Sequence, residues 1–144
     1  MKTIYILRHG KVDKEPKVCD GTPLNSAGTL FSERACKLLE NESIDYVVCD
    51  STIRAIQTVM PLLIAKGIPY SILPTTAASI PSEVQTRAQT VLFCGRWEGI
   101  RGLNQVQINI GDTDRGEFYK NIFVYGFKKD RKPYEFSRKI EVTK

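Results

Sequence analysis

The chain has 144 residues, of which 42% are hydrophobic and 26% are charged, and its formal net charge is +5. A chain of this length and composition forms one globular domain whose core needs neither disulfides nor metals. No stretch approaches the length of a membrane span and the first apolar run is too short for a signal peptide, so we expect a single domain, residues 1–144, without membrane association.

The first half of the chain alternates strands and helices. Thr3–Leu7 is an apolar run that predicts a buried strand, and a polar loop follows it. A helix is predicted from Asn25-Ser26, where either side chain could cap it, to about Glu40. Ile44–Cys49 is a second predicted strand. The next predicted helix begins at Ile53 and ends at Gly67, with a bend at Pro61.

The second half continues the alternation and ends in a hairpin. We expect a strand at Tyr70–Leu73, a short helix at Pro81–Gln89 with Ser79 as a weak cap, a strand at Val91–Cys94 and a helix through Ile100, Leu103 and Val106. The tail is predicted to pair Asn121–Phe127 with Tyr134–Val142 across a charged turn.

This order of elements predicts an α/β fold with three layers, α/β/α, around a mainly parallel sheet that closes with a C-terminal antiparallel hairpin. In such sheets ligands bind beyond the carboxyl ends of the strands. Three pairs of residues fall at those ends, namely Arg8-His9, Asp50-Ser51 and Gly95-Arg96.

His9 is the only histidine of the chain and lies between Arg8 and Gly10 where the first strand ends. A histidine beside an arginine, with a glycine that allows close approach of the backbone, suits a nucleophile that attacks a phosphoryl group. Arg54 lies in the first turn of a predicted helix, where backbone N–H groups and a bidentate side chain bind phosphate. Taken singly, these residues also fit an ordinary strand-end histidine and a surface arginine.

Three segments together resemble the histidine phosphatase superfamily, also called the phosphoglycerate mutase-like family. They are Ile6–Gly10, Gly21–Gly28 and Ser51–Thr58. The resemblance implies that His9 becomes phosphorylated and that Arg8 and Arg54 bind the transferred group, with Ser51 as a further phosphate contact. Asp50 stands where a serine is usual, which puts one neutral phosphate contact in doubt.

The segment Val91–Arg101 is similar to the family pattern V-V-S-H-G-G-V-I-R, and Ile100-Arg101 sets the register. In this register Arg96 occupies the position of the second catalytic histidine, and the predicted tail hairpin resembles the closing strands of the family. Glu83 is then the candidate general acid, although a solvated glutamate at a helix start has the same pattern. In a rival register, Phe93–Gly99 resembles the f-G-x-W-E-G loop of larger members, and Glu98 would be the acid.

Cysteine content and charge bear on metals and partners. Four scattered cysteines without a C-x-x-C pair and one histidine argue against a zinc site, so we expect no metal, no cofactor and a cytoplasmic protein with reduced thiols. The tail is basic, through Lys128, Lys129, Arg131, Lys132, Arg138, Lys139 and Lys144. Such clusters can bind nucleic acid but are more often solvated, so we do not expect a nucleic-acid partner.

Three hypotheses follow. The first is a phosphatase that hydrolyses a phosphomonoester or phosphohistidine, in a small molecule or a phosphoprotein, through a phosphohistidine on His9. Its activity is expected to be weakened, because Arg96 keeps the positive charge but can obstruct in-line attack. The second is a non-catalytic relative that binds a phosphorylated ligand or partner, and the third is a basic nucleic-acid-binding module. Crowded cations should lower the pKa of His9.

Overall fold

The computed structural model describes the chain except residues 16, 76–79, 107, 112, 129–130 and 144. Its centre is a six-stranded sheet with the strand order β3-β2-β4-β1-β5-β6. The first four strands are parallel where they pair: β1 (Thr3–Arg8), β2 (Tyr46–Asp50), β3 (Tyr70–Leu73) and β4 (Thr90–Gly95). β5 (Asn121–Lys128) runs antiparallel to β1, and β6 (Arg131–Glu141) runs antiparallel to β5. The mainly parallel sheet and the closing hairpin are confirmed.

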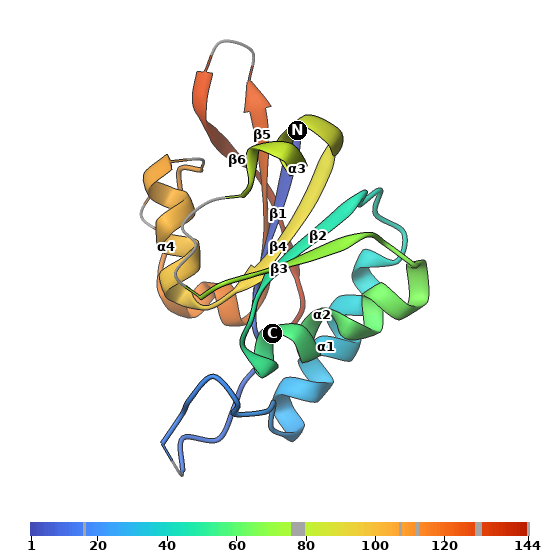
Figure 1. Cartoon of the computed structure of the whole chain (residues 1–144). Coiled ribbons are helices and arrows are strands. Elements are labelled where there is room, and N and C mark those ends of the chain that lie inside the picture. The colour runs from blue at the N-terminus through green and yellow to red at the C-terminus, as the bar shows by residue number, and fades with distance from the viewer. Residues whose placement is uncertain (16, 76–79, 107, 112, 129–130, 144) are drawn as a thin grey trace.

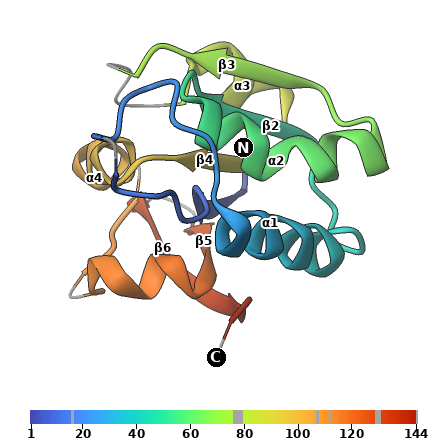
Figure 2. The same cartoon turned by 90° about the horizontal axis from the view of Figure 1, so that it is seen from below.

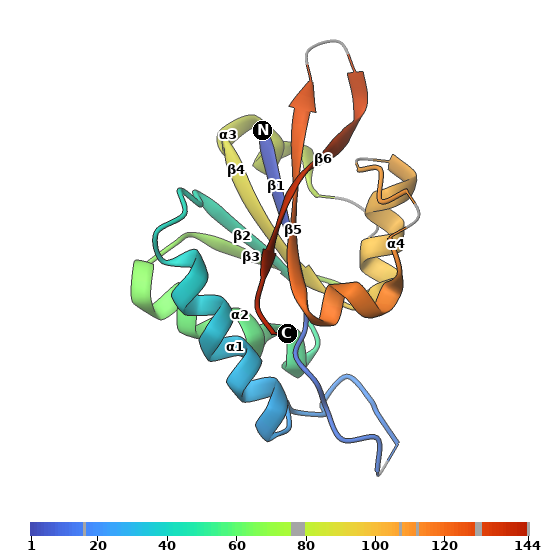
Figure 3. The same cartoon turned by 180° about the vertical axis from the view of Figure 1, so that it is seen from behind.

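Helices cover both faces of this sheet (Figures 1 and 3). One face carries α1 (Ser26–Leu39) and α2 (Ile53–Lys66). The other carries α3 (Ser82–Arg87), α4 (Trp97–Val106) and the 3-10 helix η1 (Arg115–Tyr119).

The apolar sequence of the central strands explains why both faces are covered. In β1, Tyr5 and Leu7 pack against the α1 and α2 side, whereas Ile4 and Ile6 pack against the α3 and α4 side. Successive side chains of a strand point to opposite faces, so an unbroken apolar run must be buried on both. The three-layer arrangement predicted from the sequence is confirmed.

Local signals set the ends of the two long helices. The side chain of Asn25 accepts a hydrogen bond from the backbone N–H of Gly28 and caps α1. Thr52 caps α2, which continues past Pro61 and ends at Gly67, whose φ of 62° is the left-handed conformation that glycine adopts readily.

Some expectations differ in detail. β2 begins at Tyr46 rather than Ile44, because the side chain of Asp45 accepts hydrogen bonds from the backbone of Gln89 and Thr90 at the start of β4. α4 begins at Trp97, and η1 had no signal in the sequence. α3 has no side-chain cap, and Ser79, the expected one, lies outside the described residues.

The carboxyl ends of the parallel strands meet at one end of the sheet, which Figure 2 views from below. β1 ends at Arg8, β2 at Asp50 and β4 at Gly95. The segment that joins β1 to α1 lies across this end of the molecule (Figure 2). The fold therefore brings together the segments to which the sequence assigns phosphate chemistry.

The four cysteines are free thiols, of which Cys36, Cys49 and Cys94 are buried and Cys19 is exposed. Among the described residues, no helix combines the length and apolar character needed to cross a bilayer.

Candidate active site

The loop after β1 is held by backbone contacts that only glycines permit. A Cβ atom on Gly10 would lie 2.7 Å from the carbonyl oxygen of Gly28, and one on Gly28 would lie 2.2 Å from that of Lys11. The backbone N–H of Gly10 donates to Thr58 Oγ1 at 2.9 Å, and this hydroxyl donates to the carbonyl of Arg54 at 2.7 Å. The end of β1 is thereby fixed against both α1 and α2.

Arg8, the last residue of β1, is 2% exposed. Its guanidinium carbon lies 3.6 Å from the centre of the Tyr119 ring, and Nη1 donates to the carbonyl of Arg115 at 3.4 Å. Its buried Nε finds no hydrogen-bond partner among the described residues. Burial lowers the pKa of Arg8, because a guanidinium away from water lacks the solvation it has on the surface. Such a group is strongly stabilised by an anion.

His9 follows directly and is 6% exposed. Its Nδ1 lies 2.7 Å from the carbonyl oxygen of Gly10, and because a carbonyl only accepts, Nδ1 carries the proton. Nε2 of the neutral ring is then the unprotonated nitrogen. Burial, above all, and the charges of Arg54 and Arg8 lower the pKa of His9 to about 4. The expected lowering is confirmed, although burial contributes more to it than crowding by cations does.

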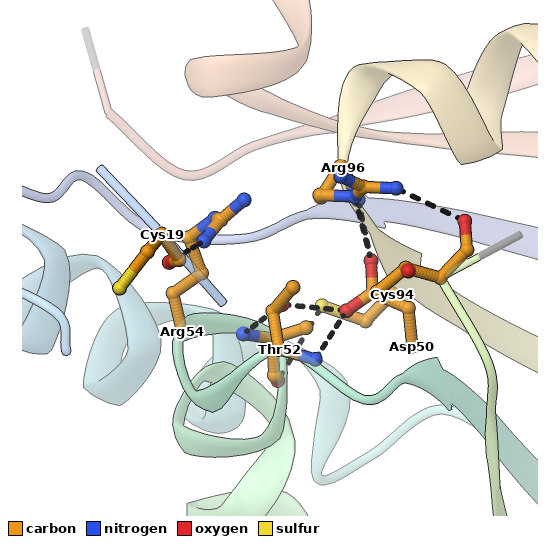
Figure 4. A network of polar contacts seen from close by, with 8 residues as sticks. Cys19, Asp50, Thr52, Arg54, Cys94 and Arg96 are labelled. Carbon is orange, nitrogen blue, oxygen red and sulfur yellow. Dashed lines mark hydrogen bonds and ion pairs between the residues drawn. The ribbon is translucent and has the colours of Figure 1, made fainter. Parts of the chain in front are cut away.

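Arg54 enters the same region from the first turn of α2 and is 7% exposed. Its Nη1 donates to the carbonyl of Cys19 at 2.9 Å, which ties α2 to the loop between β1 and α1 (Figure 4). The remaining donors of the guanidinium lie at the positive end of the helix dipole.

Asp50 and Arg96 contact each other across the ends of β2 and β4 (Figure 4). Asp50 Oδ2 accepts from the backbone N–H of Arg96 at 3.0 Å and lies 3.8 Å from Nε of its side chain. Asp50 Oδ1 accepts from the backbone and hydroxyl of Thr52. Nη2 of Arg96 donates to the carbonyl of Thr75 at 3.0 Å. The carboxylate thus binds both the cap of α2 and the arginine that follows β4.

A pocket of about 570 Å³ opens between these elements. Arg8, His9, Arg54 and Arg96 all line it, so the structure brings together four residues that the sequence singled out. Glu98, from the first turn of α4, lines it as well.

Two other predicted site residues lie elsewhere. Glu83 is exposed at the start of α3, whose Gln85 carbonyl accepts from the N-terminal ammonium group at 2.7 Å. α3 therefore lies near the amino end of β1 (Figure 1), whereas His9 follows the carboxyl end of that strand. This placement does not support Glu83 as a general acid. Ser51 is exposed and is not among the described residues that line the pocket.

The pocket also holds residues that the sequence reasoning missed. Lys11 and Lys14 come from the loop after β1, Trp97 from α4, and Arg115 and Tyr119 from η1. Lys11 and Lys14 could have been found from their distance to His9 along the chain. No sequence signal pointed to η1, because its contact with Arg8 depends on the pairing of β5, which follows η1, with β1.

Within the described part of the chain, no three histidine, cysteine or carboxylate side chains cluster in a way that could hold a metal ion. The basic tail is described only in part. Lys129 and Lys144 lie outside the described residues, and so do the side chains of Lys128, Arg131 and Lys132. Arg138 forms an ion pair with Glu42.

Solved structures of phosphatases share this fold. A protein from Agrobacterium tumefaciens, provisionally named the phosphohistidine phosphatase SixA, is 19% identical with a TM-score of 0.69, and the match covers 96% of this chain and 97% of that one. A protein histidine phosphatase SixA in complex with tungstate is 14% identical with a TM-score of 0.73, covering 96% of each chain. A mycobacterial glucosyl-3-phosphoglycerate phosphatase is 11% identical with a TM-score of 0.66, covering 100% of each.

A comparison with curated protein sequences finds no match. The model of the histidine phosphatase superfamily (branch 1) matches residues 4–76, the half of the chain that supplies Arg8, His9 and Arg54. The chain therefore belongs to the histidine phosphatase superfamily, branch 1.

Proposed function

We propose that this chain is a phosphatase that transfers a phosphoryl group from a phosphorylated substrate to His9 and then to water. One observation carries the proposal: the buried His9 ring, whose Nδ1 contacts the Gly10 carbonyl and leaves Nε2 as the nucleophile, lines one pocket with the buried Arg8 guanidinium. A neutral ring is the nucleophilic form, and its pKa of about 4 keeps it neutral at physiological pH. Two proteins of similar structure are named as phosphatases, which is consistent with this chemistry.

In the first step, Nε2 of His9 attacks phosphorus in line with the ester bond. The phosphorus–oxygen bond breaks, and the leaving oxygen takes a proton from the carboxylic acid form of Glu98. Arg8 and Arg54 stabilise the charge that spreads over the three equatorial oxygens. We assign the acid role to Glu98 because it lines the pocket with His9.

In the second step, a water molecule attacks the phosphohistidine. The carboxylate of Glu98 takes a proton from that water, the phosphorus–nitrogen bond breaks, and its electron pair returns to Nε2. Inorganic phosphate leaves, and both the imidazole and the Glu98 carboxyl regain their starting forms. The cycle requires no metal and no cofactor.

A second candidate is a protein that binds phosphorylated ligands without turnover. The observation that favours it is the fixed position of Arg96, which is held by Asp50 and by the carbonyl of Thr75 instead of being free to follow the reacting group. In both candidates Arg96 adds a positive charge that does not vary with accessible pH.

Two measurements on the same preparation separate these candidates. Hydrolysis of p-nitrophenyl phosphate tests turnover, with His9→Ala as the blank, and calorimetric titration with tungstate tests anion binding. Turnover that His9→Ala abolishes supports the phosphatase. Tungstate binding without turnover supports the binding protein, and the absence of both contradicts a phosphate site. Quenching the reaction with alkaline detergent, which preserves the acid-labile phosphorus–nitrogen bond, should trap phosphate on the wild type but not on His9→Ala.

A further inference from the structure

A second cavity, of about 410 Å³, adjoins the phosphate pocket. The two share Lys11 and Tyr119 as lining residues. The Tyr119 ring, which lines both cavities, stacks on Arg8 at 3.6 Å, and its centre lies 6.3 Å from that of the His9 ring. Because Lys11 and Tyr119 border both cavities, a group bound in the second cavity lies next to the phosphate pocket.

The floor of the second cavity is apolar. It is formed by Ala27, Leu30 and Phe31 from the first turns of α1. Phe31 is 6% exposed and belongs to the core, whereas Leu30 keeps 46% of its surface exposed beside it. A ring or a short hydrocarbon chain placed here would cover Leu30, and removal of this apolar surface from water would favour binding.

The rim of the second cavity is positively charged. Lys11, Arg34 and Lys120 line it, and no aspartate or glutamate is among its described lining residues. These three cations form no ion pair with the described residues. The ion pairs found among those residues join Arg96 to Asp50 and Arg138 to Glu42. The cavity thus offers unpaired positive charge above an apolar floor.

We infer that this second cavity holds the leaving group of the substrate, and that the substrate is a small phosphomonoester whose leaving group combines an apolar body with an anionic group. The inference rests on the proposed function, since it takes the phosphoryl group to be at His9. The apolar body lies against Leu30, and a carboxylate or second phosphate lies among Lys11, Arg34 and Lys120. A cavity of this volume is typical of small-molecule sites, which favours a small ester over the broad surface of a phosphoprotein.

Two phosphonates that cannot be hydrolysed test this assignment without any need for turnover. They are benzylphosphonate and 4-carboxybenzylphosphonate, titrated by calorimetry into the wild-type protein. We expect the carboxylated ligand to bind at least tenfold more tightly, because only it reaches the cationic rim. A peptide with a non-hydrolysable phosphohistidine analogue is the third ligand, and tighter binding of that peptide than of the carboxylated phosphonate would overturn the assignment.

Charge reversal identifies the cavity. In Arg34→Glu/Lys120→Glu the preference for the carboxylated ligand should fall at least tenfold, while the affinity for tungstate changes less than twofold. Lys37→Glu is the matched control, because Lys37 is exposed on α1 and does not line the cavity. An unchanged preference in the double variant, or an equal loss in the control, would contradict the inference. If the wild-type protein does not bind tungstate at all, the proposed phosphate site itself is contradicted.

Discussion

Asp50 and Arg96 are two of the positions at which this chain departs from the family pattern described above, and they contact each other. In the register that the resemblance implies, Asp50 takes the place of a usual serine and Arg96 takes the place of the second histidine. Because Asp50 is 7% exposed, its charge needs the partners that the structure supplies. We therefore expect the Arg96 guanidinium to compensate the buried charge of Asp50. The sequence at either position alone does not reveal this pairing.

Substitutions at this pair should be coupled. Arg96→His alone leaves Asp50 without its ion-pair partner and should lower the free energy of unfolding by about 1–2 kcal/mol, because Asp50 keeps its bonds from Thr52. In Asp50→Ser/Arg96→His the loss of free energy of unfolding should be smaller, by at least about 1 kcal/mol, than the sum of the losses in the two single variants. Urea unfolding measures all four proteins. Additivity within about 0.5 kcal/mol would show that the pair is not coupled.

The double variant is also the correct background for testing whether a histidine at position 96 raises turnover. In the single variant Arg96→His, the new imidazole lies beside an unpaired carboxylate, which raises its pKa and changes its role. A failure of the single variant would therefore say little about the register of Arg96.

At the scale of elements, β1, α1 and α2 are held together at Gly10, because its backbone packs against that of Gly28 in α1 and its N–H donates to Thr58 Oγ1 in α2. Sequence patterns located these elements well, since the apolar run of β1, the Asn25 cap and the Gly67 terminator are local signals. They could not locate η1, nor decide between Glu83 and Glu98, because both depend on contacts between segments far apart in the chain. Glu83 has the residue type of a general acid at a helix start, but α3 lies at the amino end of β1, away from the pocket that His9 lines.

Gly28→Ala should test the packing of α1 against the loop after β1. The added Cβ would lie 2.2 Å from the carbonyl oxygen of Lys11 and 2.8 Å from its nitrogen, and backbone atoms cannot move aside as a side chain would. Overpacking costs up to about 3 kcal/mol, whereas the better helix propensity of alanine returns about 1 kcal/mol. We expect a net loss of about 2 kcal/mol in thermal unfolding followed by circular dichroism.

Gly21→Ala is the matched control, because its Cβ would meet only the Cys19 sulfur at 3.9 Å. It should change stability by less than about 0.5 kcal/mol. Equal stability of the two variants would mean that the loop after β1 can move away from α1.

At the scale of the whole molecule, one buried titratable group links stability to pH. His9 has a pKa of about 4 in the folded chain and its ordinary value of 6.5 in the unfolded one. Between these values the unfolded chain binds a proton that the folded chain does not. The free energy of unfolding therefore falls as pH is lowered through this window, by up to about 3 kcal/mol.

Urea unfolding between pH 7 and pH 4 measures this dependence in the wild type and in His9→Asn. Carboxylates titrate in both proteins, so the difference between the two curves isolates His9. The variant should lose less stability over this range. Since the chain has one histidine, its imidazole resonances report the folded-state pKa directly by NMR, and saturating tungstate should raise that pKa. If stability falls equally with pH in the wild type and in His9→Asn, or if the imidazole titrates near 6.5, His9 does not cause the pH dependence.

The distribution of thiols has a practical consequence. Cys19 is exposed while the other three cysteines are buried, and the hydroxyl of Thr22, which donates to its sulfur, lowers the pKa of Cys19. A maleimide dye should therefore label the native protein at this one position. Because the carbonyl of Cys19 accepts the hydrogen bond from Arg54, fluorescence from such a reporter would follow ligand entry in real time, without any engineered cysteine.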